Sequence, residues 1–511
     1  MIKYIILKSG LCCIALSLIS VACSKSESTK DATEASRFGE KYAENLLKNG
    51  FNNTKSKEIN VAAQKKITDK NDSAIENFAP ALISGAVAYL GKDMELDKLS
   101  IVLASLFETM KGEGADLPAE GQRHLRGTVA RKAFSSYAKI VTDQTKWSAA
   151  ISAISKQSVK SITASGIEAT DLQETIGEIT SELMHSMQDI GVDKNKTDDY
   201  AAAIVAGEIT GVAGFAAAAD LKKYVSDIAV RSIGNLDGIG AKTDEQKLKA
   251  IFEITSQGAS TILNLSGQTH DQAIELCKEL VSGAMSALDD AGLSDASLDK
   301  AIKIILRGTL KGLDGKGTSQ ALSATERLTA ATSMITAGMS GLKDNYALSG
   351  EANFGAAMRA FSAGATLGLS DAGAGTAELL SASDDLAKQA TSQLDEAELP
   401  PEIRIAMAKE LAKGMAVGLK KSGVSAAAIK DVKDEIATAI KSEMEGALAG
   451  TPELADYIAG QVAFDTDVQA AVEAEANTPA VTTPEPGDSD YQEPTGTTAP
   501  ESLAEEQTPA T

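Results

Sequence analysis

KELVSGAMSALDDAGLS occupies residues 278–294, and the ungapped copy KELAKGMAVGLKKSGVS occupies residues 409–425. The two copies are identical at seven of seventeen positions, and GEITSELMHSMQDIGVD at 177–193 follows the same outline. In each, an apolar helical pattern stops at a glycine, which is followed by an apolar residue and then by Ser or Asp. Glycine can adopt the left-handed conformation that ends a helix, the apolar residue then packs back, and Ser or Asp can begin the next helix. The pattern predicts helices that are capped at Gly191, Gly292 and Gly423.

The distances between these copies are near multiples of about 26 residues, which is one helix of about 20 residues plus its connection. The predicted repeat is therefore a single capped helix. The periods and signatures of tetratricopeptide and ankyrin repeats are absent. We expect an irregular array or globular bundle of roughly sixteen helices, and not a regular superhelix.

The body of the chain, residues 36–476, is rich in helix-forming residues and contains only five prolines. No alternating apolar run bounded by turn residues predicts a strand. The sequence therefore predicts an all-α body, which could comprise two subdomains. Residues 477–511 hold six prolines and no basic residue, so this acidic tail is predicted to be disordered.

Glycines recur four residues apart in four places, and glycines at this spacing share one face of a helix. The pairs are Gly207 and Gly211, Gly308 and Gly312, Gly364 and Gly368, and Gly414 and Gly418. Lysines surround two of the pairs, which favours close packing in a soluble core over dimerisation in a membrane. The stretch Ala201–Ala219 has Glu208 as its only charge before Asp220, and we interpret it as a central buried helix; the alternative is a membrane-inserting helix.

The first 22 residues have the parts of a secretory signal peptide: Lys3 and Lys8, an apolar centre at 11–19, and the small residue Ala22. The apolar run is too short to span the ~30 Å hydrocarbon core permanently. The signal therefore predicts export and cleavage.

Ser20-Val21-Ala22-Cys23 resembles the lipobox of bacterial lipoproteins, with Ser20 where Leu is commonest. The resemblance implies that Cys23 carries diacylglycerol and usually an N-terminal acyl chain such as palmitate, which would anchor the protein to a membrane. Residues 23–35 would be the lipidated cysteine and a flexible tether. Ser24 after the cysteine implies the outer membrane, in a periplasmic or surface-facing orientation. The alternative is ordinary cleavage after Ala22, which would leave a free thiol.

The net charge of −22 gives the chain no electrostatic reason to bind nucleic acid. Lys441 is the last basic residue, and the 15 acidic residues that follow concentrate negative charge at the end of the chain. The expected partners are a membrane, through the lipid anchor, and another protein.

The sequence predicts no catalytic, cofactor-binding or metal-binding residue. His124, His185 and His270 lack metal-ligand spacing. Cys277 lies in a helical pattern and is predicted to be a small buried residue. Trp147 is predicted to be a core or interfacial anchor.

Two loop-like stretches resemble ligand-binding motifs only in part. Residues 193–197 open like a calcium loop, but Asp198 stands where that loop needs glycine. Residues 234–243 have the glycines of a phosphate loop, but Ala241 precedes Lys242 and no strand comes before it. Both are predicted to be joints between helices.

Together these features predict a lipid-anchored bacterial envelope protein that is a non-enzymatic interaction scaffold or binding module. One alternative is a membrane-active protein that inserts the helix near 201–219. The other is an enzyme whose site is assembled from residues distant in sequence.

Replacing Cys23 with Ala should abolish metabolic labelling with palmitate and release the protein from membranes, because the thiol is the predicted attachment point. Labelling of fractionated cells measures both effects. Unchanged labelling of the variant would exclude Cys23 as the lipidated residue.

Overall fold

The computed structural model describes residues 32–48, 72–91, 95–109, 119–162, 169–193, 196–315, 321–345, 351–396, 401–449, 466–478 and 486. The predicted signal peptide, Cys23 and the predicted tail beyond residue 478, apart from Pro486, lie outside this set. Within it there are helices and turns and no strand, which confirms the all-α fold class. The first described helix spans 32–48, so it begins inside the predicted tether; Ala35 is already fully buried there.

The labelled helices that follow are α3 (Asp72–Leu90), α4 (Leu96–Thr109), α5 (Ala119–Ile140), η1 (Gln144–Lys146), α6 (Trp147–Lys160), α7 (Ala169–Asp189), α8 (Thr197–Ala213), α9 (Ala218–Gly234), η4 (Leu236–Ile239), α10 (Asp244–Leu263), α11 (His270–Ser286), α12 (Asp295–Gly312), α13 (Ala324–Asn345), α14 (Glu351–Asp371), α15 (Thr376–Glu396), α16 (Pro401–Lys421), α17 (Ala426–Asp431) and α18 (Lys433–Ala447). A further helix spans 466–477. The predicted joint at 234–243 runs from the end of α9 to the start of α10 and contains the short helix η4, and Asp193 of the predicted joint at 193–197 follows α7.

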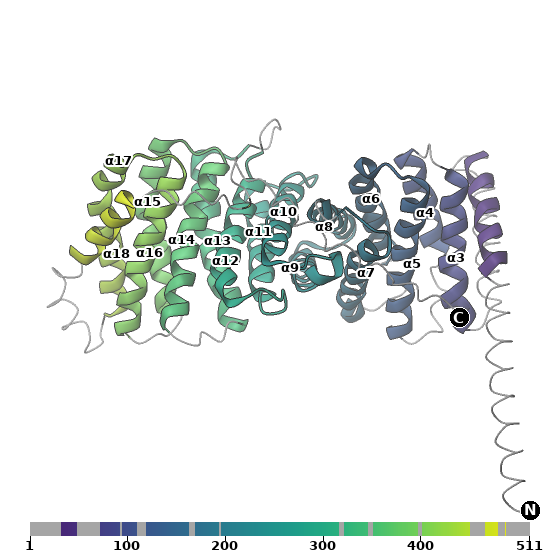
Figure 1. The fold of residues 1–511 in the computed structure, drawn as a ribbon, viewed down its shortest axis with the longest axis horizontal. Helices are drawn as coiled ribbons and strands as arrows, with labels where there is room; N and C mark the ends of the chain where they lie inside the picture. Colours follow the sequence, from purple (N-terminus) through teal and green to yellow (C-terminus); the bar gives the residue numbers. More distant parts are fainter. Residues whose placement is uncertain are drawn as a thin grey trace, which may run out of the picture.

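The helices alternate between two layers, because each packs mainly against the helices two before and two after it. We call α4, α6, α8, α10, α12, α14 and α16 the even layer. The odd layer consists of α3, α5, α7, α9, α11, α13 and α15, and α18 continues it. Figure 1 shows the labels following chain order along the long axis, from α3 to α18. The helix at 466–477 extends the even layer, because Lys409 of α16 pairs with Asp467 at 2.6 Å.

The structural repeat is a pair of helices about 50 residues long. Ion pairs between successive helices of a layer show the period: Arg131 with Glu182, Arg327 with Glu378, and Arg359 with Glu410 are each 51 residues apart. The array is thus more regular than expected. The one-helix unit predicted from the sequence describes how individual helices end and not how they pack. Its copies at 177–193 and 278–294 lie in the odd layer, whereas the copy at 409–425 lies in the even layer.

All four predicted glycine pairs lie in the even layer, where each faces the preceding helix of that layer. A Cβ atom on Gly364 of α14 would lie 2.6 Å from the backbone oxygen of Lys303 in α12. Cβ atoms on Gly207, Gly312 and Gly414 would overlap backbone oxygens of α6, α10 and α14 respectively. The glycines therefore allow backbone-to-backbone contact along this layer.

The predicted caps have the expected backbone conformation. Gly191, Gly292 and Gly423 have φ values of 65°, 61° and 82°. At the end of α16, the Val424 amide donates to Leu419 O and the Gly423 amide donates to Lys420 O, which is the Schellman arrangement. The α-helical part of α11 ends earlier, at Ser286, and turn residues continue to Gly292.

α8 is a central buried helix, as predicted, although its predicted end at Ala219 is wrong. It stops at Ala213, because the amides of Gly214 and Phe215 bond three residues back and tighten the last turn, and α9 begins at Ala218. Nearly every residue of α8 is buried. No helix in the described ranges has the length and apolarity needed to cross a membrane.

Trp147 is a core anchor at the start of α6, as predicted. Its indole nitrogen donates to Val141 O at 2.6 Å, and its ring centroid lies 6.0 Å from those of Phe134 in α5 and Tyr200 in α8. The ring therefore joins the two layers, since α5 belongs to one and α6 and α8 to the other.

Replacing Gly414 with Ala should destabilise the protein by about 1 to 3 kcal/mol, because the new methyl group would push α16 away from Arg359 O in α14. The matched control is Gly446→Ala in α18, where a Cβ atom would meet nothing within 4 Å. That variant should be as stable as the parent or up to about 1 kcal/mol more stable, because alanine favours helix. Urea melts compare the three proteins; equal midpoints for the two variants would contradict backbone contact as the role of Gly414.

Candidate interaction groove

The one predicted site residue, Cys23, lies outside the described residues. Cys277 of α11 is fully buried, and burial raises the pKa of its thiol, in keeping with the predicted role as a small core residue. The described residues contain no group of three or more His, Cys, Asp or Glu side chains placed to hold a metal ion.

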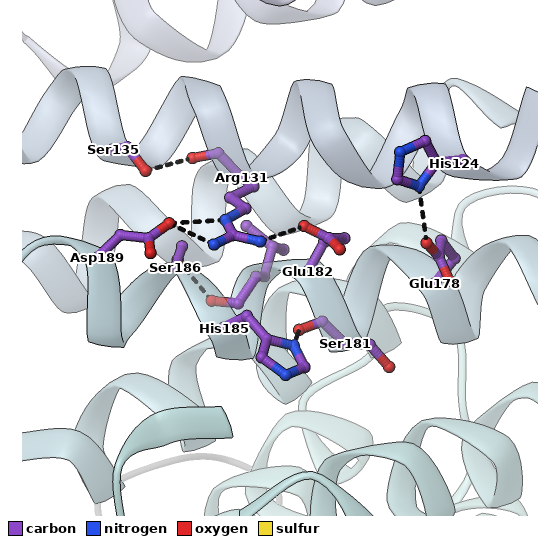
Figure 2. A network of polar contacts seen from close by, with 10 residues as sticks. His124, Arg131, Ser135, Glu178, Ser181, Glu182, His185, Ser186 and Asp189 are labelled. Carbon is purple, nitrogen blue, oxygen red and sulfur yellow. Dashed lines mark hydrogen bonds and ion pairs between the residues drawn. The ribbon is translucent and has the colours of Figure 1, made fainter. Parts of the chain in front are cut away.

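The three histidines lie apart, each with its own partner in the odd layer. His124 Nδ1 of α5 is 3.4 Å from Glu178 Oε1, and His185 Nδ1 of α7 is 2.7 Å from Ser181 O (Figure 2). His270 Nδ1 of α11 is 2.8 Å from Glu326 Oε1 of α13. The structure therefore brings no two of them to a common site.

A large cavity lies on the even layer, over α14. Its volume is about 670 Å³, and we call it the α14 groove. Small residues of α14 form its floor: Gly355, Ala356, Ala360 and Ala363. The walls come from longer side chains of the flanking helices, including Lys303 of α12 and Met407 of α16. The groove exists because α14 presents small side chains between two helices that present larger ones.

An ion-pair network crosses the α14 groove and fixes its shape. Arg359 of α14 donates from Nε and Nη2 to Glu410 Oε2 of α16, at 2.9 and 2.5 Å. Lys413 donates to the other oxygen of the same carboxylate at 2.6 Å. Burial alone would raise the pKa of Glu410, but the hydrogen bonds from Lys413 and Arg359 outweigh it and hold the pKa below its usual range. Two cations therefore share one ionised acid.

A second even-layer cavity of about 530 Å³ lies over α8, and we call it the α8 groove. Its floor again consists of small residues: Thr210 and Ala213 of α8, and Gly214 directly after that helix. Lys156 and Lys160 of α6 line one wall, and hydroxyl and amide side chains of α10 line the other. No acidic residue lines this groove.

Two further cavities, on the odd layer, are smaller, and their linings hold more acidic than basic residues. One of about 310 Å³ spans α5, α7 and α9 and includes Glu120, Glu174 and Glu178. Another, of about 410 Å³, spans α13, α15 and α18 and includes Asp385 and Glu443. The two faces of the array thus offer different electrostatic surroundings.

Charged side chains also link neighbouring helices in the odd layer. Arg131 of α5 lies between two acids of α7, with Nη1 2.9 Å from Glu182 Oε2 and Nε 2.7 Å from Asp189 Oδ2 (Figure 2). These links were not predicted from the sequence, because acidic and basic residues that are close in sequence indicate only a solvated face of one helix. The common separation of 51 residues between Arg and Glu was the signal that could have found them.

No protein-family model and no curated protein matches this chain. Neither even-layer groove is lined by histidine or cysteine, and Glu410 in the α14 groove is ionised and bound by two cations.

Glu208 lies beneath the α8 groove, on the inner side of α8, and is fully buried. Its Oε2 is 2.9 Å from Thr180 Oγ1, and that hydroxyl is also 2.9 Å from Ile176 O. The Thr180 hydroxyl is placed to donate to both oxygens. Burial, the main cause, raises the pKa of Glu208 well above its ordinary value, and the hydrogen bond from Thr180 opposes this rise. The folded protein therefore holds the proton of Glu208 to a higher pH than the unfolded chain does.

The raised pKa of Glu208 predicts a pH-dependent stability. In the unfolded chain the carboxyl loses its proton above its ordinary pKa of about 4.3, whereas the folded protein retains it, so rising pH favours unfolding. Glu208→Gln removes this penalty. The free energy of unfolding of the variant, relative to that of the parent, should therefore rise as the pH increases from about 4 to about 8, a range that begins near the pKa of the unfolded carboxyl. Urea melts across this range measure the difference.

The control for Glu208→Gln is Glu435→Gln, at an exposed position of α18. Its stability difference from the parent should not change in the same way with pH. If the difference in unfolding free energy between Glu208→Gln and the parent is constant across the range, the folded protein does not hold the proton of Glu208 more tightly than the unfolded chain does.

Proposed function

We propose that this chain is a lipid-anchored bacterial envelope protein whose helical body is a non-enzymatic interaction scaffold. The lipobox-like Ser20–Cys23 segment motivates the anchor and the outer-membrane location. The observation that carries the scaffold role is the pair of grooves on one layer of an elongated array. Stacked helical repeats commonly bind partners along such extended faces.

The composition of the grooves favours a polypeptide partner. The α8 groove is lined mainly by small, hydroxyl, amide and lysine side chains, and the α14 groove by small, apolar and charged ones. Neither lining contains an aromatic residue, whereas sugar-binding sites commonly stack sugars on aromatic rings. The α14 groove combines an apolar floor with charged walls, which suits a peptide that presents both apolar and polar groups.

The surface also favours this role over membrane insertion. Tyr89, at 40% exposure, is the exposed large hydrophobic side chain among the described residues. The helix that motivated the membrane-active alternative, α8, is buried between its neighbours. Exposing it would cost the packing of the central repeats, so recognition by polar grooves is the better-supported function.

Photocrosslinking in intact cells tests the scaffold role. A benzoylphenylalanine placed at Ala356, which lines the α14 groove and is partly exposed, should crosslink to one discrete protein. The same group at Ser381, on an exposed position of α15 in the odd layer, is the matched control. The expected result is a product specific to Ala356. Identical products from both positions, or none from Ala356, would contradict a binding function for the groove.

A further inference from the structure

Basic and acidic residues are distributed unequally between the two layers. Within the helix bounds given above, the even-layer helices α4 to α16 contain 15 basic and 14 acidic residues. The odd-layer helices α3 to α15, together with α18, contain 14 basic and 24 acidic residues. Among the four cavities described above, the α8 groove on the even layer is the one whose lining holds basic residues and no acidic residue. The α8 groove is thus a local basic site on an acidic protein.

Lys156 of α6 supplies positive charge to the α8 groove that no other side chain neutralises. It lines the groove, is partly exposed, and its ammonium group has no ion-pair or hydrogen-bond partner among the described residues. Lys160, one turn further along α6, already interacts within the chain, and its Cε would lie 3.9 Å from a Cβ atom on Gly214. Lys160 therefore closes one end of the groove, and Lys156 is the cation with which a ligand can pair.

The C-terminal ends of α8 and α10 lie at the groove, and carbonyl groups at such ends attract cations when they are unpaired. Some of these carbonyl oxygens are already used as acceptors. At the end of α8 the Gly214 amide donates to Gly211 O at 3.2 Å. At the end of α10, Asn264 donates to Ser260 O from its backbone amide at 3.2 Å and from Nδ2 at 2.8 Å. A cationic ligand would also be repelled by Lys156, so the groove favours an anionic group.

The wall opposite Lys156 carries polar side chains that are available for hydrogen bonding. The side chains of Gln257 and Ser260 in α10 line this wall and make no hydrogen bond among the described residues. An amide side chain and a hydroxyl can each donate and accept. A polypeptide main chain presents a donor and an acceptor at nearly every residue. The α10 wall can therefore hold the main chain of a peptide while Lys156 pairs with one of its carboxylates.

We propose that the α8 groove binds an acidic segment of a partner polypeptide. A carboxylate of the segment pairs with Lys156, and its main chain lies along Gln257 and Ser260. This inference rests on the proposed scaffold function and specifies one binding site and the chemistry of its partner. The floor of small residues leaves a volume of about 530 Å³ for the segment. Another acidic segment is this chain's own end, residues 479–511, which contain no basic residue.

Fluorescence anisotropy with the full chain tests the proposal on three labelled peptides: (Glu-Ala)6, its isosteric neutral counterpart (Gln-Ala)6 and the basic (Lys-Ala)6. The parent should bind (Glu-Ala)6 most tightly, and the preference should weaken at higher salt because Lys156 is partly exposed. Lys156→Gln should reduce the affinity for (Glu-Ala)6 about two- to fivefold, as expected for the loss of one such charge pair. Lys156→Glu should reduce it further, because the new carboxylate repels the peptide.

The matched control is Lys132→Gln in α5 of the odd layer. Lys132 is also partly exposed and also lacks an ion-pair partner among the described residues. The control variant should bind (Glu-Ala)6 as the parent does, and circular dichroism melts establish that all variants are folded. No binding of (Glu-Ala)6, equal binding of the three peptides, or an equal loss in Lys156→Gln and Lys132→Gln would overturn the proposal.

Photocrosslinking in intact cells identifies the occupant of the α8 groove. A benzoylphenylalanine at Ser266, an exposed residue of the groove lining, should crosslink within an acidic segment of another protein. A crosslink to residues 479–511 of the same chain, or to a partner without an acidic segment, would overturn the proposal. Either result leaves the scaffold function standing, because that function is tested separately from Ala356 in the α14 groove.

Discussion

Close backbone contact between successive helices of a layer is the constraint on which the rest of the structure depends. At Gly207, Gly312, Gly364 and Gly414, a single added methyl group would overlap or crowd a backbone oxygen of the preceding helix in the even layer. Gly283 of α11 makes the same kind of contact in the odd layer, with Ser226 O of α9. Interiors are packed too densely to absorb such a change without moving a helix. These contacts therefore fix the spacing of the helices within each layer.

The same constraint shapes the exposed face. A helix whose sides are packed closely against two neighbours can present only a narrow outward strip, and α8 and α14 fill that strip with Ala, Gly and Thr. The neighbouring helices α6, α10, α12 and α16 present longer polar side chains, so grooves form over α8 and α14. Arg359 with Glu410 then links two successive helices across one of these grooves. The packing inside the layer and the grooves on its outer face thus depend on the same helices.

Local patterns in the sequence predicted local structure well. The glycine caps at 191, 292 and 423, the helical class and the buried nature of α8 all follow from backbone and hydrophobic preferences of neighbouring residues. The alternation of the helices between two layers does not follow from these preferences, because it is a relation between residues that are about 50 positions apart in the sequence. The copies at 278 and 409 are misleading in this respect, since they lie in different layers and their separation is not a multiple of the two-helix period. The α14 groove was missed because it needs three helices at once.

The difference in charge between the layers matters because electrostatic interactions in salt are short-ranged. A helix with its side chains is about 10 Å across, so the outer faces of two stacked layers lie about 20 Å apart. The Debye length is about 8 Å at physiological ionic strength, which is well below that separation. A ligand on the even layer therefore interacts mainly with the charges of that layer, and the excess acids of α7 and α15 on the opposite face repel it weakly. The net charge of −22 therefore acts weakly at the α14 groove, where the nearest charges are those of Lys303, Arg359, Asp299 and Glu410.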